Sequence, residues 1–283
     1  MYVIICWPHW VSRAKGRIVA IRLQLSDLLV HEVEYLVRTR GYALVEGYLD
    51  ESECQVLKCA YEPLLLAYKA GGNARSHQDQ HHIHDLLAQD LLFGTLLEDQ
   101  GLQQLLAPLL GPSWIMYAFT SSSVPPRGEN FGHRVHVDSP RLIPGHPTNI
   151  GIIWALDEFT SANGATEVLP GSNHQFERPS DELFAKHCAR VCCAAGSLVV
   201  FDARVYHRAG VNQTDRWRHS LTMNCCRPYM KQRMDWVRLI PEGIARKLNA
   251  QARRLIGFDT RLPTSLDEFF VPDEQRLYRA GQE

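Results

Sequence analysis

The sequence lacks any apolar run of about 18 residues, the length that a helix needs to cross a bilayer. It also lacks net charge, because 30 basic residues oppose 31 acidic ones and leave −1. Such a balance gives no long-range attraction for a phosphate backbone, and no basic, aromatic-rich stretch is present. We therefore expect neither a membrane nor a nucleic-acid partner. Internal repeats and low-complexity segments are also absent.

The apolar opening segment, Met1–Trp10, lacks both the basic flank and the cleavage site of a secretory signal. Eight cysteines are present, and without such a signal we expect reduced thiols rather than disulfides. The spacing of Cys188, Cys192 and Cys193 lacks the second paired cluster that is typical of a zinc site. A cytoplasmic location is the prediction.

The composition itself is that of an ordinary globular protein, with 45% apolar and 22% charged residues. Helical patterns come first. Ser26–Arg40 has a capping serine and an apolar stripe, and Gly41 follows it. Asp50 and Glu53 form a capping box that opens a second helix, which Pro63 is expected to kink or end. Further expected elements are a strand over Tyr42–Tyr48 and helices over Leu86–Leu110 and Ile244–Ile256.

From residue 113 onward, short β-prone runs alternate with turn residues, which predicts a double-sheet jelly roll. The fold class is mainly β with flanking helices (α+β), with a double-stranded β-helix as its core. Residues 1–283 are expected to form one domain: N-terminal helices with a possible lid (1–112), the jelly-roll core (113–227) and a helical tail (228–283). The expected strands are Trp114–Thr120, Arg134–Asp138, Asn149–Leu156, Thr166–Leu169, Arg190–Cys193, Ser197–Phe201, Val205–His207 and Ser220–Cys226.

Two histidines and a carboxylate can meet within this core. In a strand, residues i and i+2 project from the same face, so His136 and Asp138 would point together while Val137 points away. His207, on a later β run, can supply a third ligand. Three such ligands leave the other positions of an iron(II) ion open for a co-substrate and O2. A merely hydrogen-bonded His–Asp pair is the alternative for the H-x-D alone.

Arg218 follows His207 by eleven residues and is expected to start the last core strand, beside the strand of His207. Its planar guanidinium suits bidentate pairing with a carboxylate, so it can hold the far end of a dicarboxylic 2-oxo acid. Arg216 would share its face and competes for this role.

Further motifs follow the H-x-D in a fixed order, and with them the chain resembles the phytanoyl-CoA dioxygenase family over about residues 30 to 230. The motifs are Trp154, Asn163-Gly164-Ala165, Val168-Leu169-Pro170-Gly171-Ser172-Asn173-His174, Gly196-Ser197-Leu198-Val199-Val200-Phe201, His207 and Arg218.

This resemblance implies a double-stranded β-helix and an iron(II)- and 2-oxoglutarate-dependent oxygenase. It assigns iron to His136, Asp138 and His207, the distal carboxylate of 2-oxoglutarate to Arg218, and the lining of the co-substrate site to Trp154. Some members have a serine two positions after the distal histidine, where this chain has Ala209. Ser220, two positions after Arg218, is the candidate to replace that hydroxyl.

A second H-x-D, His77-Gln78-Asp79, competes with the first and precedes His81, His82 and His84. It lies before the β-rich region and lacks the downstream motifs, which favours a lid over a metal site for this segment.

The expected activity is hydroxylation of a small-molecule metabolite, with iron(II) as cofactor, 2-oxoglutarate and O2 as co-substrates, and release of succinate and CO2. The related halogenases replace the metal carboxylate by a small residue, so Asp138 indicates a hydroxylase. The alternative is a cupin-like metal-binding protein or isomerase without oxygenase activity. Candidate substrate contacts are Arg134, Arg141 and His146; a structural ion pair is the other role open to Arg134.

Overall fold

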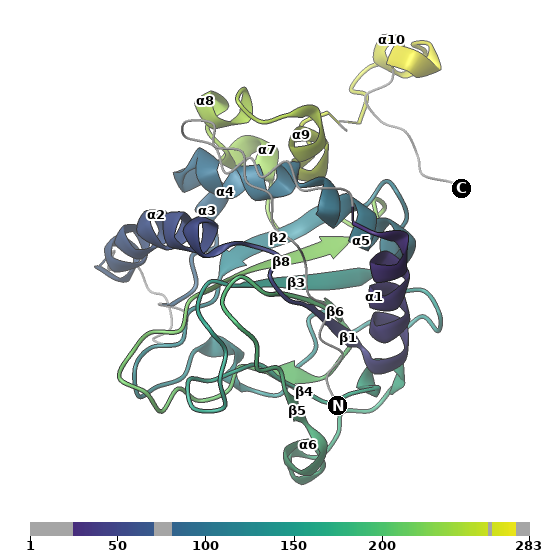
Figure 1. The fold of residues 1–283 in the computed structure, drawn as a ribbon. Helices are drawn as coiled ribbons and strands as arrows, with labels where there is room; N and C mark the ends of the chain where they lie inside the picture. The colour runs from purple at the N-terminus through teal and green to yellow at the C-terminus, as the bar shows by residue number, and fades with distance from the viewer. Residues whose placement is uncertain (1–24, 71–80, 260–261, 276–283) are drawn as a thin grey trace.

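Two antiparallel sheets form the centre of the molecule. The computed structural model describes residues 25–70, 81–259 and 262–275. Five strands pair in the order β1-β6-β3-β8-β2, and three pair in the order β5-β4-β7 below them (Figure 1). The strands are β1 (Tyr42–Val45), β2 (Ile115–Ser121), β3 (Asn149–Ala155), β4 (Glu167–Val168), β5 (Ala189–Arg190), β6 (Leu198–Asp202), β7 (His207–Arg208) and β8 (Ser220–Cys226).

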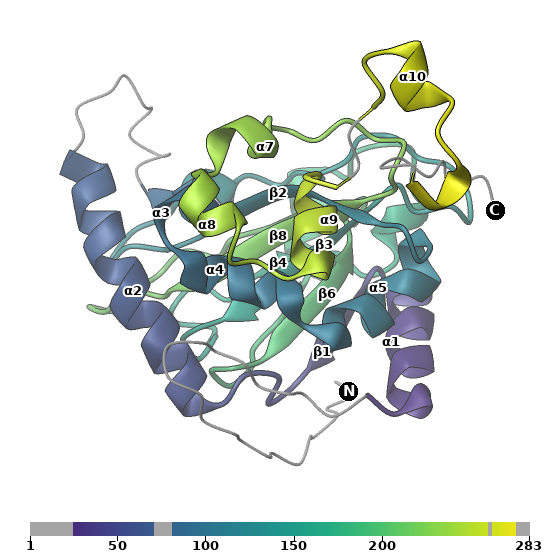
Figure 2. The same ribbon diagram turned by 90° about the horizontal axis from the view of Figure 1, so that it is seen from above.

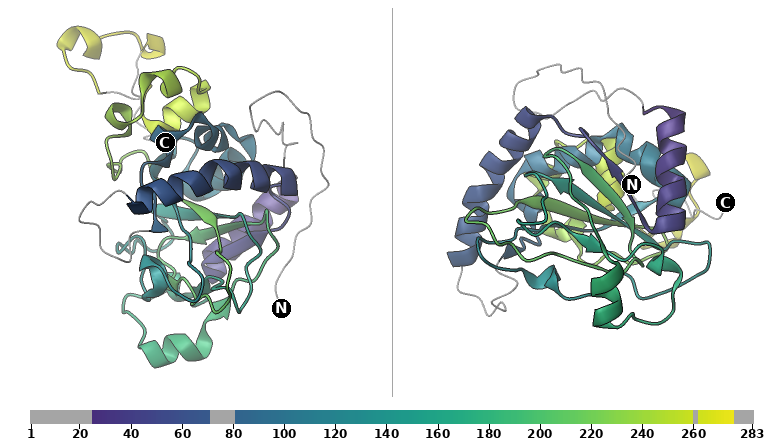
Figure 3. Two further views of the ribbon diagram at one scale, coloured as in Figure 1. Left: turned by 90° about the vertical axis from the view of Figure 1, so that its left-hand side faces the viewer. Right: turned by 60° about the horizontal axis from the view of Figure 1, so that its bottom comes forward.

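Helices cover the outer face of the five-stranded sheet, as the view from above shows (Figure 2). The short helix α6 lies instead beyond the three-stranded sheet, on the opposite side of the molecule (Figure 3). The helices are α1 (Asp27–Arg40), α2 (Glu51–Ala70), α3 (Leu86–Gln89), α4 (Leu91–Thr95), α5 (Gln100–Leu110), α6 (Asp181–His187), α7 (Trp236–Leu239), α8 (Glu242–Ala245), α9 (Ala250–Ile256) and α10 (Leu266–Phe269). Among the helices that the structure describes, none combines the length and hydrophobicity needed to span a bilayer.

The expected caps are present at both N-terminal helices. The hydroxyl of Ser26 accepts from the backbone at the start of α1, and Gly41 ends the helix with φ +86°. At α2, Asp50 and Glu53 exchange the two hydrogen bonds of a capping box. Of the two effects expected of Pro63, a kink or an end, the end does not occur, because α2 continues to Ala70.

The predicted jelly roll is confirmed, with two differences in its composition. Strand β1, expected outside the core, is an edge strand of the five-stranded sheet and pairs with β6. The run Arg134–Asp138, expected to be a strand, has only one bridge, between His136 and His207. This segment therefore follows the edge of the three-stranded sheet without becoming a full strand of it.

The five-stranded sheet has two buried faces with different partners. Along β3, Ile150, Ile152 and Trp154 belong to the apolar core beneath the helices. Ile153 faces the other sheet, as does Thr222 opposite it on β8. Because side chains alternate along a strand, β3 and β8 each place one set in the helical core and the other set in the space between the sheets.

Candidate metal centre

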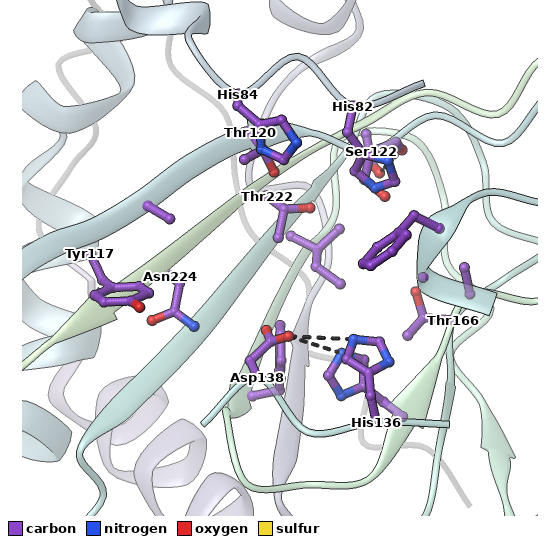
Figure 4. Close-up of a pocket in the computed structure, with 18 of the residues that line it drawn as sticks. His82, His84, Tyr117, Thr120, Ser122, His136, Asp138, Thr166, Thr222 and Asn224 are labelled. Carbon is purple, nitrogen blue, oxygen red and sulfur yellow. Dashed lines mark hydrogen bonds and ion pairs between the residues drawn. The ribbon is translucent and has the colours of Figure 1, made fainter. Parts of the chain in front are cut away.

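The space between the two sheets contains a pocket of about 350 Å³. His136 and Asp138 lie on its floor, and His82, His84 and Ser122 lie on the opposite side (Figure 4). His207 also lines the pocket. Strand β8 contributes Ser220, Thr222 and Asn224 to the wall. The remaining lining residues are Tyr117, Ala118, Thr120, Phe131, Gly132, Ile153, Thr166, Phe201, Ala209, Arg218 and Arg233.

His136, Asp138 and His207 each direct one ligand atom toward a common point. These atoms lie within 4.8 Å of one another, and no other such group of three occurs among the described residues. Oδ1 of Asp138 is 3.4 Å from Nε2 of His136 and 3.9 Å from Nε2 of His207. The predicted triad is thus assembled in a geometry that can hold a metal ion.

Backbone hydrogen bonds fix both imidazoles in the orientation that a metal requires. Nδ1 of His136 donates to the carbonyl of Arg134 at 2.7 Å, and Nδ1 of His207 donates to the carbonyl of Val205 at 3.0 Å. A carbonyl can only accept, so the proton of each neutral ring is on Nδ1 and the lone pair is on Nε2. The two histidines therefore present metal-binding nitrogens, with carbonyl groups orienting them from behind.

The segment that carries the H-x-D is tied to the opposite side of the metal centre. His136 and His207 exchange backbone hydrogen bonds of 3.0 Å each, and the amide of Asp138 donates to the carbonyl of Ala203 at 2.9 Å. Val137 points away and packs against the small apolar cluster of Leu169, Phe184 and Tyr206. A single bridge is thus sufficient to give the alternation that the sequence predicts.

The charges of Asp138 and His207 suit a divalent cation. Burial, together with the neighbouring His136, lowers the pKa of His207. Burial also disfavours the charged form of His136, but Asp138 outweighs it and raises the pKa of His136. For Asp138, the effect of burial is outweighed by its hydrogen bond to His136 and by the charges of the two histidines and Arg233, so its pKa is lowered. An ionised carboxylate and a neutral imidazole are the forms that bind metal.

Arg218 reaches the same pocket from the other sheet. It precedes β8 and pairs by a backbone bridge with Val124, so the expectation that it lies beside the strand of His207 was wrong. The residue is 2% exposed, and Cζ of its guanidinium lies 4.2 Å from the ring centroid of Phe159. It forms no ion pair among the described residues, and burial lowers its pKa to about 10. The competitor Arg216 is exposed and faces a different surface.

Of the other two residues expected near 2-oxoglutarate, one lines the pocket and one does not. Ser220 lies in the wall, and its hydroxyl donates to the carbonyl of Ser122 at 2.6 Å. Trp154 is fully buried in the helical core, where it packs against Phe119. The expectation for Trp154 was wrong, because Trp154 lies on the face of β3 that meets the helices. Its neighbour Ile153 lies on the face that meets the pocket.

The three predicted substrate contacts lie outside the pocket. Arg134 is exposed, forms no ion pair within the described ranges, and contributes to the centre only through its carbonyl. Arg141 and His146 line a separate hollow of about 100 Å³, and His146 lies 3.0 Å from the hydroxyl of Tyr229. The loop after the H-x-D therefore turns away from the metal centre, which the sequence did not reveal.

Several lining residues were not predicted. Tyr117, Asn224 and Arg233 line one end of the pocket, although the tail after residue 227 was given no role. His82 and His84, from the segment proposed as a lid, line another part. His77 and Asp79 lie outside the described residues.

The arrangement fits iron(II): two imidazole nitrogens and one carboxylate on one side, with open space on the other. Together with the jelly roll, it defines the class of non-haem iron(II)- and 2-oxoglutarate-dependent oxygenases. The family model of phytanoyl-CoA dioxygenase matches residues 37–220, and the chain belongs to this family. The expected iron(II), 2-oxoglutarate and O2 are confirmed by this membership and by the His-Asp-His group.

Known relatives extend over most of the chain. The uncharacterized protein Rv1501 of Mycobacterium tuberculosis is 31% identical over 266 residues, which are 91% of this chain and 97% of that protein. The Fe(II)/2-oxoglutarate-dependent dioxygenase nvfF of Aspergillus novofumigatus is 25% identical over 245 residues, covering 78% of this chain and 79% of its own. Among solved structures, EctD from S. alaskensis with 2-oxoglutarate and 5-hydroxyectoine has a TM-score of 0.59 at 21% identity, over 72% of this chain and 76% of that one. This likeness supports the fold.

Proposed function

We propose that the protein hydroxylates a C–H bond of a small-molecule metabolite and converts 2-oxoglutarate and O2 to succinate and CO2. His136, Asp138 and His207 hold the iron, and Arg218 binds the distal carboxylate of 2-oxoglutarate. Bound there, iron(II) supplies O2 activation coupled to decarboxylation of the 2-oxo acid.

The observation that carries this proposal is the unpaired Arg218 in the pocket of the triad. A buried guanidinium without a carboxylate partner is unfavourable in an unliganded protein, and a dicarboxylate that reaches it from the metal supplies that partner. Nε of Arg218 has no hydrogen-bond partner among the described residues. A cupin-like isomerase has no need for such a group beside its metal.

The protein side chains determine how the co-substrate lies. Arg218 fixes one end of the diacid, and the Ser220 hydroxyl, which donates to Ser122, keeps its oxygen lone pairs directed at the same region. Asp138 fills the position that would have to be vacant for a halide. Its presence supports hydroxylation rather than halogenation.

Two measurements test the proposal. The iron(II)-loaded protein should develop a visible charge-transfer absorption when 2-oxoglutarate is added without O2, and succinate release should increase with the right member of a metabolite panel. Absence of the absorption would favour the cupin-like alternative.

The two H-x-D motifs are separated by matched variants. His136→Ala and Asp138→Ala should abolish the absorption, while His77→Ala and Asp79→Ala should retain it. The opposite pattern would overturn the metal assignment.

A further inference from the structure

Strand β2 has an irregularity that changes which side chains face the pocket. Its pairing with β8 shifts register between Met116 and Ala118, leaving Tyr117 as the extra residue. Tyr117 and Ala118 both line the pocket, whereas Met116 lies in the helical core. A β-bulge re-aims a side chain in this way. Here it adds a phenol to the pocket wall.

The segment after β8 is fastened to the same bulge and brings Arg233 to the pocket. The amide of Arg233 donates to the carbonyl of Tyr117 at 3.1 Å. Before Arg233 in the sequence, the side-chain amide of Gln232 donates to the carbonyls of Met116 and Ile256. After it, the indole of buried Trp236 donates to the carbonyl of Tyr117. The side chain of Arg233 is thus exposed at the pocket, while hydrogen bonds of its own amide and of the residues before and after it fix its backbone.

Three hydrogen-bond donors at this end have no acceptor among the residues that the structure describes. Asn224 is 9% exposed, and its Oδ1 accepts from Nδ2 of Asn149 at 2.8 Å, so its own Nδ2 is the group left for the pocket. Within the described ranges, the phenol of Tyr117 and the guanidinium of Arg233 also form no hydrogen bond or ion pair. Figure 4 shows Tyr117 and Asn224 side by side. Donors in this arrangement match a group that only accepts.

2-Oxoglutarate cannot occupy this end while it is bound to Arg218. Arg218, just before β8, and the alternate residues Ser220, Thr222 and Asn224 of β8 line the wall. Six steps of extended chain lead from Arg218 to Asn224, about 20 Å between their backbones. A five-carbon diacid that also binds the metal does not span that distance, so the donors at the far end are available to the substrate.

The charges of the pocket favour an anion at this end. Asp138 is the one carboxylate among the described residues that line the pocket, while Arg218 and Arg233 are both cationic. The charges of iron(II) (+2), Asp138 (−1), 2-oxoglutarate (−2) and Arg218 (+1) would add up to zero. Arg233 leaves one positive charge for a singly charged partner.

We propose that Tyr117, Asn224 and Arg233 form a subsite for a carboxylate of the substrate, so that the enzyme acts on small organic acids. This inference rests on the proposed function and specifies its substrate class. Arg233 provides the charge, and Asn224 and Tyr117 direct the carboxylate oxygens.

Ligand-observed proton NMR tests the subsite without turnover. The protein is loaded with Mn(II) and saturating 2-oxoglutarate, and unbound metal is removed. Straight-chain carboxylates of increasing length are then compared with the amides of the same length. Paramagnetic broadening of their protons measures binding near the metal. We expect at least one carboxylate to bind roughly tenfold or more tightly than its amide, the effect of one charge-assisted hydrogen bond.

Variants assign the preference to its residues. Arg233→Gln should remove the difference between carboxylate and amide, Arg233→Lys should keep most of it, and Asn224→Asp should reverse it while still accepting from Asn149. Lys231→Gln removes the same charge from an exposed neighbour outside the pocket and should change nothing. Equal binding of carboxylates and amides to the wild type, or a preference that survives Arg233→Gln, would overturn the inference. If the protons of 2-oxoglutarate itself are not broadened, the proposed function fails instead.

Discussion

Arg218 shows a conflict between function and stability at a single residue. No carboxylate among the described residues forms an ion pair with its buried guanidinium, and burial lowers its pKa to about 10, so the charge is poorly solvated before the co-substrate binds. In the proposed function, the same isolation would give the site its affinity for a diacid.

Arg218→Met should therefore raise the free energy of unfolding of the unliganded protein by about 1 kcal/mol or more, because an apolar side chain of similar length replaces an unpaired buried charge. Its affinity for 2-oxoglutarate should fall at least about 100-fold, since a desolvated carboxylate loses its partner. Urea unfolding and titration of the charge-transfer absorption measure the two effects. Arg216→Met, at the exposed neighbour, should change neither; loss of 2-oxoglutarate binding there would exchange the two assignments.

At this scale, the sequence predicted which chemically distinctive side chains lie together in the pocket. The triad and Arg218 combine side chains of suitable type at suitable intervals, and these features do not depend on the details of the loops. Trp154 was misplaced because all seven residues of β3 are buried, so its pattern does not show which face meets the pocket. Tyr117 was missed because a bulge is not visible in the alternation of the strand.

Among the elements, β4 fastens both of its neighbours through one carboxylate. Glu167 stands opposite Arg190 of β5 and Arg208 of β7 in the register of the sheet. Its two oxygens accept from Arg190 at 3.0 Å and from Arg208 at 2.7 Å. Since β7 also carries His207, this ionic group holds a metal ligand in place from outside the pocket.

Glu167→Gln should lower the stability of the protein at neutral pH by about 1–3 kcal/mol, because charge-assisted hydrogen bonds become neutral ones. Burial opposes ionisation, but the two arginines outweigh it and lower the pKa of Glu167. The stabilisation is thus present above the unfolded pKa of about 4.3 and is lost as the pH falls through the lower folded value. Unfolding curves of wild type and variant should converge in acid. Exposed Glu158→Gln serves as control, and a difference that is constant with pH would contradict this account.

Gly151 determines how closely β3 approaches the ring beside the metal centre. A Cβ atom there would lie 2.1 Å from Phe201, whose ring contacts that of His207 at 5.0 Å between centroids. Gly151→Ala should destabilise the protein by about 1–3 kcal/mol and weaken metal binding, measured by thermal unfolding and iron titration. Gly243→Ala has open space in a helix and should be neutral or slightly stabilising. Unchanged metal affinity in Gly151→Ala would show that the ring moves away from the site.

The order of the elements was more predictable than their extent. Caps and capping boxes are local, so the starts of α1 and α2 followed from the sequence alone. Whether extended segments pair depends on distant partners, and thus the run around His136 forms a single bridge and β1 joins a sheet whose other strands follow much later. Long-range pairing is the information that a local pattern lacks.

In the molecule as a whole, the residues proposed to bind the metal and 2-oxoglutarate are divided between two sheets. His207 lies on the three-stranded sheet, whereas Ser220 begins β8 of the five-stranded one and Arg218 lies two residues before it. A ligand that contacts both joins the two layers only in the folded state. Binding is therefore linked to global stability.

At about 100 times its dissociation constant, each of Mn(II) and 2-oxoglutarate should stabilise the folded protein by about 2.7 kcal/mol. The melting temperature should therefore rise by roughly 5–10 °C over that of the EDTA-treated protein. Differential scanning fluorimetry measures it. Asp138→Ala should lose the response to metal, and Arg218→Met should lose the additional response to 2-oxoglutarate. A shift that persists in Asp138→Ala would place the metal elsewhere.

The alternating residues of β8 have a consequence for regioselectivity. This strand lies between β3 and β2, with hydrogen bonds on both sides, so the spacing of its side chains is fixed. With a carboxylate bound at Tyr117, Asn224 and Arg233, the carbon that meets the oxidant is determined by its distance from that carboxylate. Homologous acids with longer tails should accordingly be oxidised at the same carbon, counted from the acid end, whatever the intrinsic strength of their C–H bonds.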